Sequence, residues 1–295
     1  MESEGTFKLL SLKSTIFVSV YEFFGTFLAL VGVNCAKNNP YVVALGFFIS
    51  ATLTGRVCGG HFNSAITVAV YITEAKWLRN LPIMFLIIFI DLLGAFCAMG
   101  LSIAMLGEEG TFKLYPPVRD IGGSFSVIGI LFVESLFTWI LVSTVLFVKY
   151  RKVSSSTDGM LSNLTCAIAV FVCVSMAGPI SGAGLNPTFG SALQITDVIL
   201  HAYYPDQSQK IYPEYLPAYI FGPILGGCMA ALMLHLTSYV TPDVVKEEIA
   251  DLAQMQYIST EGDIMADGNG ARKSIAKRKI SGTGVVLLTK KDYMM

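Results

Sequence analysis

The sequence is poor in charged residues. Asp, Glu, Lys and Arg make up 14% of its 295 residues, whereas soluble domains carry about 25%. Hydrophobic residues make up 54%, and the mean hydropathy is +0.62. This balance excludes an ordinary soluble protein, and a net charge of −1 leaves no basic surface for nucleic acid.

The few charges are unevenly placed along the chain. Of the 41 charged residues, 16 lie in residues 243–295. We therefore divide the chain into an N-terminal segment at 1–13, a membrane domain at 14–240, and a tail at 241–295 that is partly helical. Six scattered cysteines indicate no disulfide framework. Ser, His and acidic residues form no nucleophile arrangement, so we expect no enzyme.

Long apolar runs define the membrane domain. A bilayer core of about 30 Å needs about 20 apolar helical residues. Five runs reach that length, and a sixth, at 41–54, is short enough to need either tilt with local thinning or a continuation buried in protein. The five are residues 14–34, 81–106, 127–148, 161–179 and 215–239.

Six spans place both chain ends on one side of the membrane. Eight basic residues fall on that side and four on the other. Because cytoplasmic loops carry an excess of Lys and Arg, we expect both termini in the cytoplasm, at the plasma membrane or an internal membrane. The eight are Lys8, Lys13, Arg56, Lys76, Arg79, Lys149, Arg151 and Lys152, and the four are Lys37, Lys113, Arg119 and Lys210.

The two halves of the membrane domain share landmarks in the same order. Since each half has three spans, the halves face opposite ways, as in channels and transporters whose solute site lies at the repeat interface. Each landmark is short, and glycines in spans also serve ordinary helix packing. The landmarks are Glu22 and Glu134, then Asn63-Ser64-Ala65 and Asn186-Pro187-Thr188, then Leu93-Gly94 and Leu225-Gly226.

Each asparagine motif predicts a half-helix. Residues 63–72 and 186–196 are too short to cross a bilayer. Asn is a favoured N-cap, and Pro187 suits the first helical position. If the two half-helices enter from opposite faces, their positive N-terminal ends meet near the midplane.

These motifs, with six spans, resemble the aquaporin (major intrinsic protein) family over residues 14–239. The resemblance implies an all-α membrane protein with six transmembrane helices and two re-entrant half-helices in an inverted 3+3 repeat. It implies a homotetramer, each subunit passing water, glycerol or similar small uncharged solutes. We expect no cofactor, and no metal site either, because no further His or Cys lies near Cys58 and His61. Each asparagine NH2 then donates to the passing molecule while its carbonyl is held by the half-helix, and the helix dipoles repel cations.

Buried acids and a histidine complete the predicted site. We expect Glu22 and Glu134 to accept N–H groups from the loop ahead of each half-helix; a lone acid facing pore water is the alternative. His61 either donates to backbone or lines the cytoplasmic vestibule. Asp91 has no acidic counterpart in the second half, and its role stays open.

The chain departs from the family at the outer constriction. Many members place arginine three residues after the second asparagine, where this chain has Phe189. By offset, the other constriction positions are Val174, Ala183 and either Gly46 or Phe47. This mostly apolar ring predicts a less water-optimised pore that admits glycerol, urea, ammonia or peroxide, or one that dewets and stays shut. At Ser64 many members have proline, which predicts a less rigid entry to the first half-helix.

Two other functions stay open at this stage. An alternating-access transporter uses the same repeat, and Asp91 is the feature that favours it. A structural membrane protein with an occluded pore is compatible with the apolar ring. In the tail, basic residues surround Ser274 with Ser281 nearby, so phosphorylation there would weaken any attraction to anionic lipid.

Overall fold

A computed structural model describes residues 12–37, 39–107, 111–117, 126–150, 158–203 and 212–240. Most of the N-terminal segment and the whole tail, with its expected helix, Ser274 and Ser281, lie outside these residues. The helices, contacts and cavities given below are those that these residues form.

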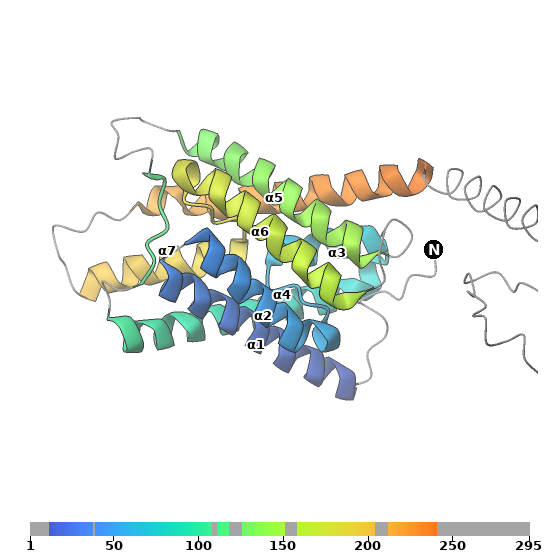
Figure 1. The fold of residues 1–295 in the computed structure, drawn as a ribbon, viewed down its shortest axis with the longest axis horizontal. Coiled ribbons are helices and arrows are strands. Elements are labelled where there is room, and N and C mark those ends of the chain that lie inside the picture. The colour runs from blue at the N-terminus through green and yellow to red at the C-terminus, as the bar shows by residue number, and fades with distance from the viewer. Residues whose placement is uncertain are drawn as a thin grey trace, which may run out of the picture. The chain divides into compact units, whose positions relative to one another are not determined.

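Six helices of the described chain are long and apolar enough to cross a membrane. The six expected spans are thereby confirmed, and the chain is an integral multi-pass membrane protein. We call the end of the bundle where α2 and α5 finish its inner end, and the opposite end its outer end (Figure 1). The helices are α1 (Leu12–Ala36), α2 (Pro40–Cys58), α4 (Trp77–Leu106), α5 (Val127–Lys149), α6 (Gly159–Ser181) and a C-terminal helix (Pro213–Val240), which opens with the 3-10 turn η2 (Pro213–Tyr215).

The second span is longer than the sequence predicted. α2 has 19 residues, against the 14 expected at 41–54. Asn39 caps its start by accepting the N–H groups of Tyr41 and Val42, and Gly59 ends it with a left-handed φ of 97°. At 1.5 Å per residue α2 is about 28 Å long, so the expected thinning is unnecessary.

Two further helices begin in the middle of the bundle and run to opposite ends (Figure 1). They are α3 (Ser64–Glu74) and α7 (Pro187–Tyr203). The expectation for α7, residues 186–196, was two turns too short. The outer loop supports the extra turns: the Gln194 side chain donates to the Leu114 carbonyl, and Asp197 binds Lys113 at 2.7 Å.

The inverted repeat is confirmed by its packing. Glu22 and Glu134 are 112 residues apart. A Cβ added to Gly94 would meet the Phe23 carbonyl oxygen, and one added to Gly226 would meet the Ser135 carbonyl oxygen. Phe23 and Ser135 are also 112 residues apart, so the same close helix crossing occurs once in each half.

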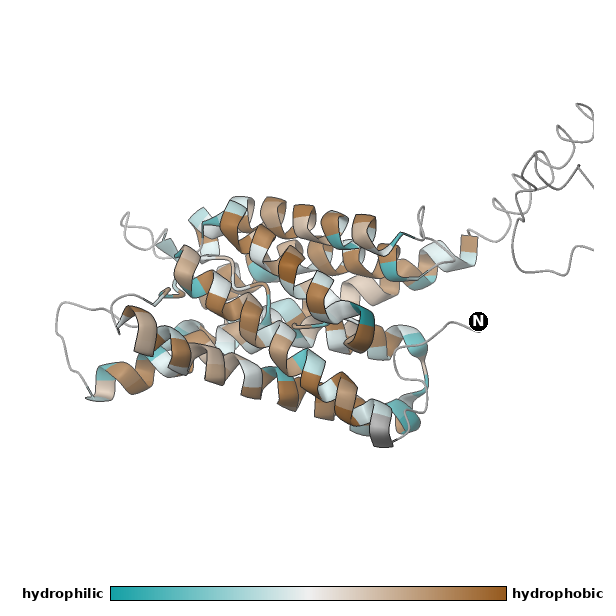
Figure 2. Cartoon of the chain, turned by 60° about the horizontal axis from the view of Figure 1, so that its bottom comes forward, coloured by the Kyte–Doolittle hydropathy of each residue, from teal (hydrophilic) through white to brown (hydrophobic). Residues whose placement is uncertain are grey.

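The outward faces of the long helices are apolar. Hydrophobic residues cover most of each helix and hydrophilic ones gather at the ends (Figure 2). Large side chains such as Leu45, Phe85, Phe132 and Leu236 are about 60% exposed. Because water would penalise so many exposed apolar groups, this surface fits lipid or another apolar partner.

Candidate functional site: a pore at the two asparagines

The loop before each half-helix has the same unusual backbone. Gly59 and Gly182 end the preceding helices in the left-handed region. Phe62 and Leu185, just before the asparagines, also have positive φ, of 50° and 48°. Such conformations are unfavourable for residues with a side chain and persist only where surrounding contacts fix them.

Two fully buried glutamates supply those contacts. Glu22 accepts the backbone N–H groups of His61 and Phe62 at 3.0 and 3.1 Å. Glu134 accepts those of Gly184 and Leu185 at 3.0 and 2.6 Å. The acceptors and donors are repeat-equivalent, so each carboxylate holds one loop.

Each asparagine caps its half-helix, as predicted. The Asn63 side-chain oxygen accepts the Ala65 N–H at 2.8 Å, and that of Asn186 accepts the Thr188 N–H at 3.0 Å. The side-chain nitrogens make crossed bonds that sequence analysis did not predict. Asn63 Nδ2 donates to the Leu185 carbonyl at 2.9 Å, and Asn186 Nδ2 donates to the Phe62 carbonyl at 2.8 Å.

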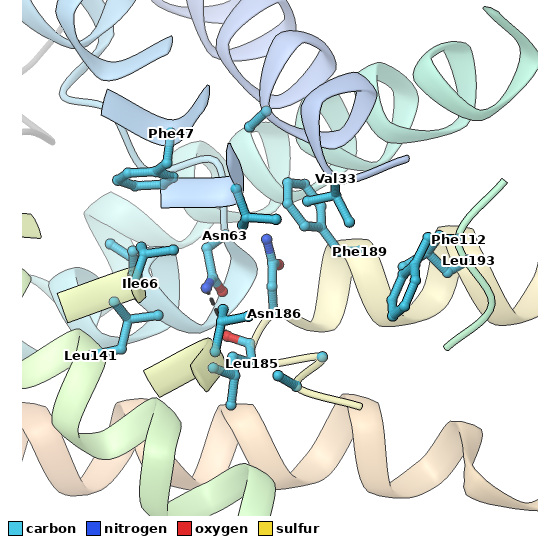
Figure 3. A pocket seen from close by; sticks show the side chains of 16 residues that line it. Val33, Phe47, Asn63, Ile66, Phe112, Leu141, Leu185, Asn186, Phe189 and Leu193 are labelled. Atoms are coloured by element: carbon cyan, nitrogen blue, oxygen red, sulfur yellow. Dashed lines mark hydrogen bonds between the residues drawn. The ribbon is translucent and has the colours of Figure 1, made fainter. Parts of the chain in front are cut away.

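The crossed bonds tie the two loops together at the repeat interface. They use one hydrogen of each NH2 group, and an amide nitrogen carries two. Both asparagines also line a cavity, lying side by side at its centre (Figure 3). Each therefore retains one donor that can serve a molecule in that cavity.

This cavity has a volume of about 60 Å³, room for a few water-sized molecules. Phe47, Ile66 and Leu141 lie to one side of the asparagines, and Phe189, Phe112 and Leu193 to the other (Figure 3). Its polar part consists of the two asparagines and the loop at residues 183–185, and its remaining lining is aliphatic or aromatic.

A wider vestibule of about 340 Å³ lies at the outer end. Phe112 and Val174 line both the vestibule and the cavity, so they form the neck between the two spaces. Lys37, Lys113 and Gly182 belong to the vestibule alone. In the described chain, the neck between the vestibule and the cavity is therefore lined by apolar side chains.

Four of the five predicted constriction residues line the cavity: Phe47, Val174, Ala183 and Phe189. The fifth, Gly46, was wrong. A Cβ added there would point to the Gly32 Cα at 3.9 Å, so Gly46 faces the α1–α2 crossing. Phe47, the alternative, lies beside Phe62, with ring centroids 6.0 Å apart, at the level of the asparagines.

Sequence analysis missed Phe112, Val43 and Leu193, which line the cavity. Val43 precedes Phe47 by one turn of α2, and Leu193 follows Phe189 by about one turn of α7, so helical periodicity could have found both. Phe112 has no such signal because it lies in the outer loop. Its N–H donates to the Asn34 side-chain oxygen at 3.1 Å, which fixes it in the neck.

Ser64 and Thr188 contact each other between the motifs. Their hydroxyl oxygens are 2.6 Å apart, and the Ser64 N–H donates to Thr188 Oγ1 at 3.3 Å. Pro187 opens α7, and Ala65 is fully buried in α3. The entry to α3 is thus held by Thr188, where the sequence predicted a looser one.

Asp91 is fully buried and accepts the Thr26 hydroxyl at 2.8 Å. It is absent from the cavity lining in the described chain. The feature that favoured a transporter therefore joins α4 to α1 and lies outside the cavity at the two asparagines.

His61 is fully buried at the inner end. Its Nδ1 lies 3.1 Å from Thr67 Oγ1, and its Nε2 lies 2.9 Å from the ammonium nitrogen of Lys149. Arg56 is exposed, as expected of a side chain that extends from the end of a span toward the membrane surface.

The chain matches the family model "Major intrinsic protein" over residues 15–234. The chain belongs to that family. Among its relatives, it is 24% identical to aquaporin NIP1-1 of Zea mays over 75% of this chain and 74% of that protein. It is 29% identical to aquaporin-8 of Mus musculus over 66% and 67%.

Comparison of structures shows the same fold. The aquaglyceroporin from Plasmodium falciparum matches with a TM-score of 0.64 at 16% identity, over 79% of this chain and 99% of that one. Family membership and the pore geometry together make the protein a membrane channel for water or small solutes, and it is no enzyme.

Proposed function

We propose that the pore conducts water together with small uncharged solutes. Glycerol, which carries both hydroxyl and CH2 groups, is the solute that the lining fits best, and urea, ammonia and peroxide complete the range. Solutes move down their own gradients without coupling to an ion. The observation that carries this proposal is the two-sided lining of the cavity.

One side of the cavity offers hydrogen bonds. Asn63 and Asn186 each retain an N–H. Ala183 and Gly184 line the cavity, so their backbone carbonyl groups are the acceptors of this proposal. The Leu185 carbonyl already accepts from Asn63, which leaves those of Ala183 and Gly184 for the solute. A hydroxyl-bearing solute thereby regains contacts that it loses on leaving water.

The other side of the cavity is hydrophobic. Phe189, Phe112 and Val174 line the cavity with aromatic and aliphatic surface. Water gains nothing from that surface, whereas the CH2 groups of glycerol are removed from water by it. The constriction therefore favours amphipathic solutes relative to a ring that carries an arginine.

The membrane arrangement belongs to the same proposal. We propose that the inner end faces the cytoplasm, since the basic residues of the sequence gather there. We also propose four subunits per assembly, each with its own pore. The exposed apolar faces of the helices supply surface for such contacts as well as for lipid.

Stopped-flow light scattering of proteoliposomes tests the proposal. Water, glycerol and urea permeabilities are measured on purified wild-type protein and compared with empty vesicles. We expect water and glycerol fluxes well above background. Fast water flux with no flux of glycerol, urea, ammonia or peroxide would contradict the solute range, and absent flux of every kind would contradict the channel.

Asn186→Asp serves as the control. The substitution replaces the donor that binds the Phe62 carbonyl with an acceptor and removes the N–H offered to the solute. We expect water and glycerol fluxes to fall together, which separates flux through this pore from leakage through the lipid.

A further inference from the structure

No fixed cation lines the neck or the cavity in the described chain. The residues of the described chain that line the cavity and neck include neither Lys nor Arg. In the vestibule beyond, Lys113 is bound to Asp197 at 2.7 Å. The dipoles of α3 and α7 repel cations near the asparagines, but the outer constriction adds no charge to them.

The repeat shows which residues surround the inner half of the pore. Equivalent residues of α1 and α5 are 112 positions apart. Equivalent residues of α2 and α6, and of α3 and α7, are 123 positions apart. Besides the two asparagines, three pairs related in this way line the cavity together. The pairs are Ala29 and Leu141, Phe47 and Val170, and Ile66 and Phe189.

Other residues of the outer cavity have their counterparts at the inner end. Val33, Val43 and Leu193, which belong to one hydrophobic cluster, correspond to Val145, Cys166 and Val70, which belong to another. In the same correspondence, Gly184 of the outer loop is replaced by His61. The inner half of the pore thus has a histidine where the outer half has a glycine.

Lys149 is bound to that histidine. It is the last residue of α5, and its ammonium nitrogen lies 2.9 Å from His61 Nε2. An ammonium group can only donate, so His61 Nε2 accepts and Nδ1 carries the proton of a neutral ring. That proton points to Thr67 Oγ1, whose hydroxyl donates to the Asn63 carbonyl at 3.3 Å.

The groups around Lys149 come from four different helices. It interacts electrostatically with Glu22 of α1, Cys58 of α2, Glu74 of α3 and Cys166 of α6. Cys166 is the inner counterpart of the cavity-lining Val43. Lys149 is also the repeat counterpart of Lys37, which lines the outer vestibule. The repeat therefore places Lys149 at the inner mouth of the pore, and its contact to His61 joins the two halves.

We propose that Lys149 is a selectivity residue of this channel. Its ammonium group, held at the inner mouth by His61, repels protons and metal cations that approach the half-helix from that end. Neutral solutes pass because they carry no charge and can accept a hydrogen bond from the same group. The inner mouth then supplies the barrier that the apolar outer neck does not.

The inference rests on the channel function proposed above and is tested in the same vesicles. Lys149→Met removes the charge while keeping an unbranched side chain, and Lys149→Arg keeps the charge. Arg56→Met is the matched control, since Arg56 is an exposed basic residue at the same end of the bundle. Proton entry is followed with an internal pH dye under a clamped membrane potential, sodium entry with a sodium dye, and water and glycerol fluxes by stopped flow.

We expect Lys149→Met to raise proton or sodium entry by about tenfold or more, as loss of a unit charge at the inner mouth implies. Water and glycerol permeabilities stay within about twofold of wild type, because neutral solutes feel little of that charge. Lys149→Arg and Arg56→Met keep entry low.

Three results would overturn the inference. One is Lys149→Met with wild-type ion entry and wild-type neutral flux. Another is a large rise in water flux through Lys149→Met without ion entry, because the Lys149–His61 contact would then act as a gate. The last is equal ion entry in Arg56→Met. If wild-type vesicles pass neither water nor glycerol, the channel function fails first, so the two failures are distinguishable.

Discussion

The hydroxyl of Ser64 lies 2.6 Å from that of Thr188, and the two residues are where the asparagine motifs differ. In the repeat, Ser64 corresponds to Pro187, and Ala65 to Thr188. A proline at the first helical position brings no N–H, whereas serine brings an N–H and a hydroxyl. Thr188 takes up both, so the departure in the first motif is matched by its partner in the second.

The Ser64–Thr188 contact predicts coupled effects on stability. Ser64→Pro and Thr188→Ala each leave buried polar atoms without a partner, and each should lower the free energy of unfolding by about 1–2 kcal/mol. In the double variant neither polar partner remains, so its free energy of unfolding should fall by less than the sum of the two single losses. The difference, which is the coupling energy, should be about 1 kcal/mol. Thermal unfolding in detergent measures all three; strictly additive losses would show that the contact contributes nothing.

The two buried glutamates predict that equivalent substitutions in the two halves cause similar losses of stability and of water flux. Glu22→Gln or Glu134→Gln places an NH2 group opposite a backbone N–H, so one buried donor loses its acceptor at a cost of about 1–3 kcal/mol. We expect both variants to melt at lower temperature and to pass less water. Glu214→Gln, at an exposed acid of the outer end, is the control. Unchanged melting in either variant would mean that its carboxylate does not hold the loop.

The structure of the neck predicts that removing its aromatic ring increases solute flux. Phe112→Ala removes a ring that borders both the vestibule and the cavity, so glycerol permeability should rise more than water permeability. Lys113→Met frees the loop from Asp197 and should act in the same direction with a smaller effect. Lys37→Met, at an exposed lysine of the same vestibule, should change neither. A rise in Lys37→Met equal to that in Lys113→Met would exclude the salt bridge as the cause.

Phe189→Arg tests the apolar constriction. The guanidinium would occupy part of a cavity of about 60 Å³ and bind water more strongly than CH2 groups. Glycerol permeability should fall by about tenfold, equivalent to about 1.4 kcal/mol, with a smaller loss for water. Phe189→Gln separates added charge from added polarity. Glycerol flux as fast as in wild type would show that Phe189 does not limit the solute.

The sequence predicted the parts of this molecule that follow from periodicity and motifs. The spans, the half-helices capped by Asn63 and Asn186, and the glutamates at Glu22 and Glu134 all rest on local patterns. Gly46 was wrong because a one-residue shift along α2 turns a side chain by about 100°, and no local signal fixed that register.

Contacts between distant segments were beyond reach of the sequence. The crossed bonds of the asparagines join residues more than 120 positions apart, and Lys149 meets His61 across 88. Phe112 lines the neck only because Asn34 and Asp197 fix its loop. No periodicity carries such information, since it arises from packing of the two halves.

The most direct test of the passive pore is glycerol flux through the wild-type protein as a function of glycerol concentration. Proteoliposomes are assayed by stopped flow with and without proton and sodium gradients. For a passive pore, glycerol flux should rise linearly with glycerol concentration and should be the same with and without the proton and sodium gradients. Saturating flux, flux that requires a gradient, or no flux above that of empty vesicles would contradict it.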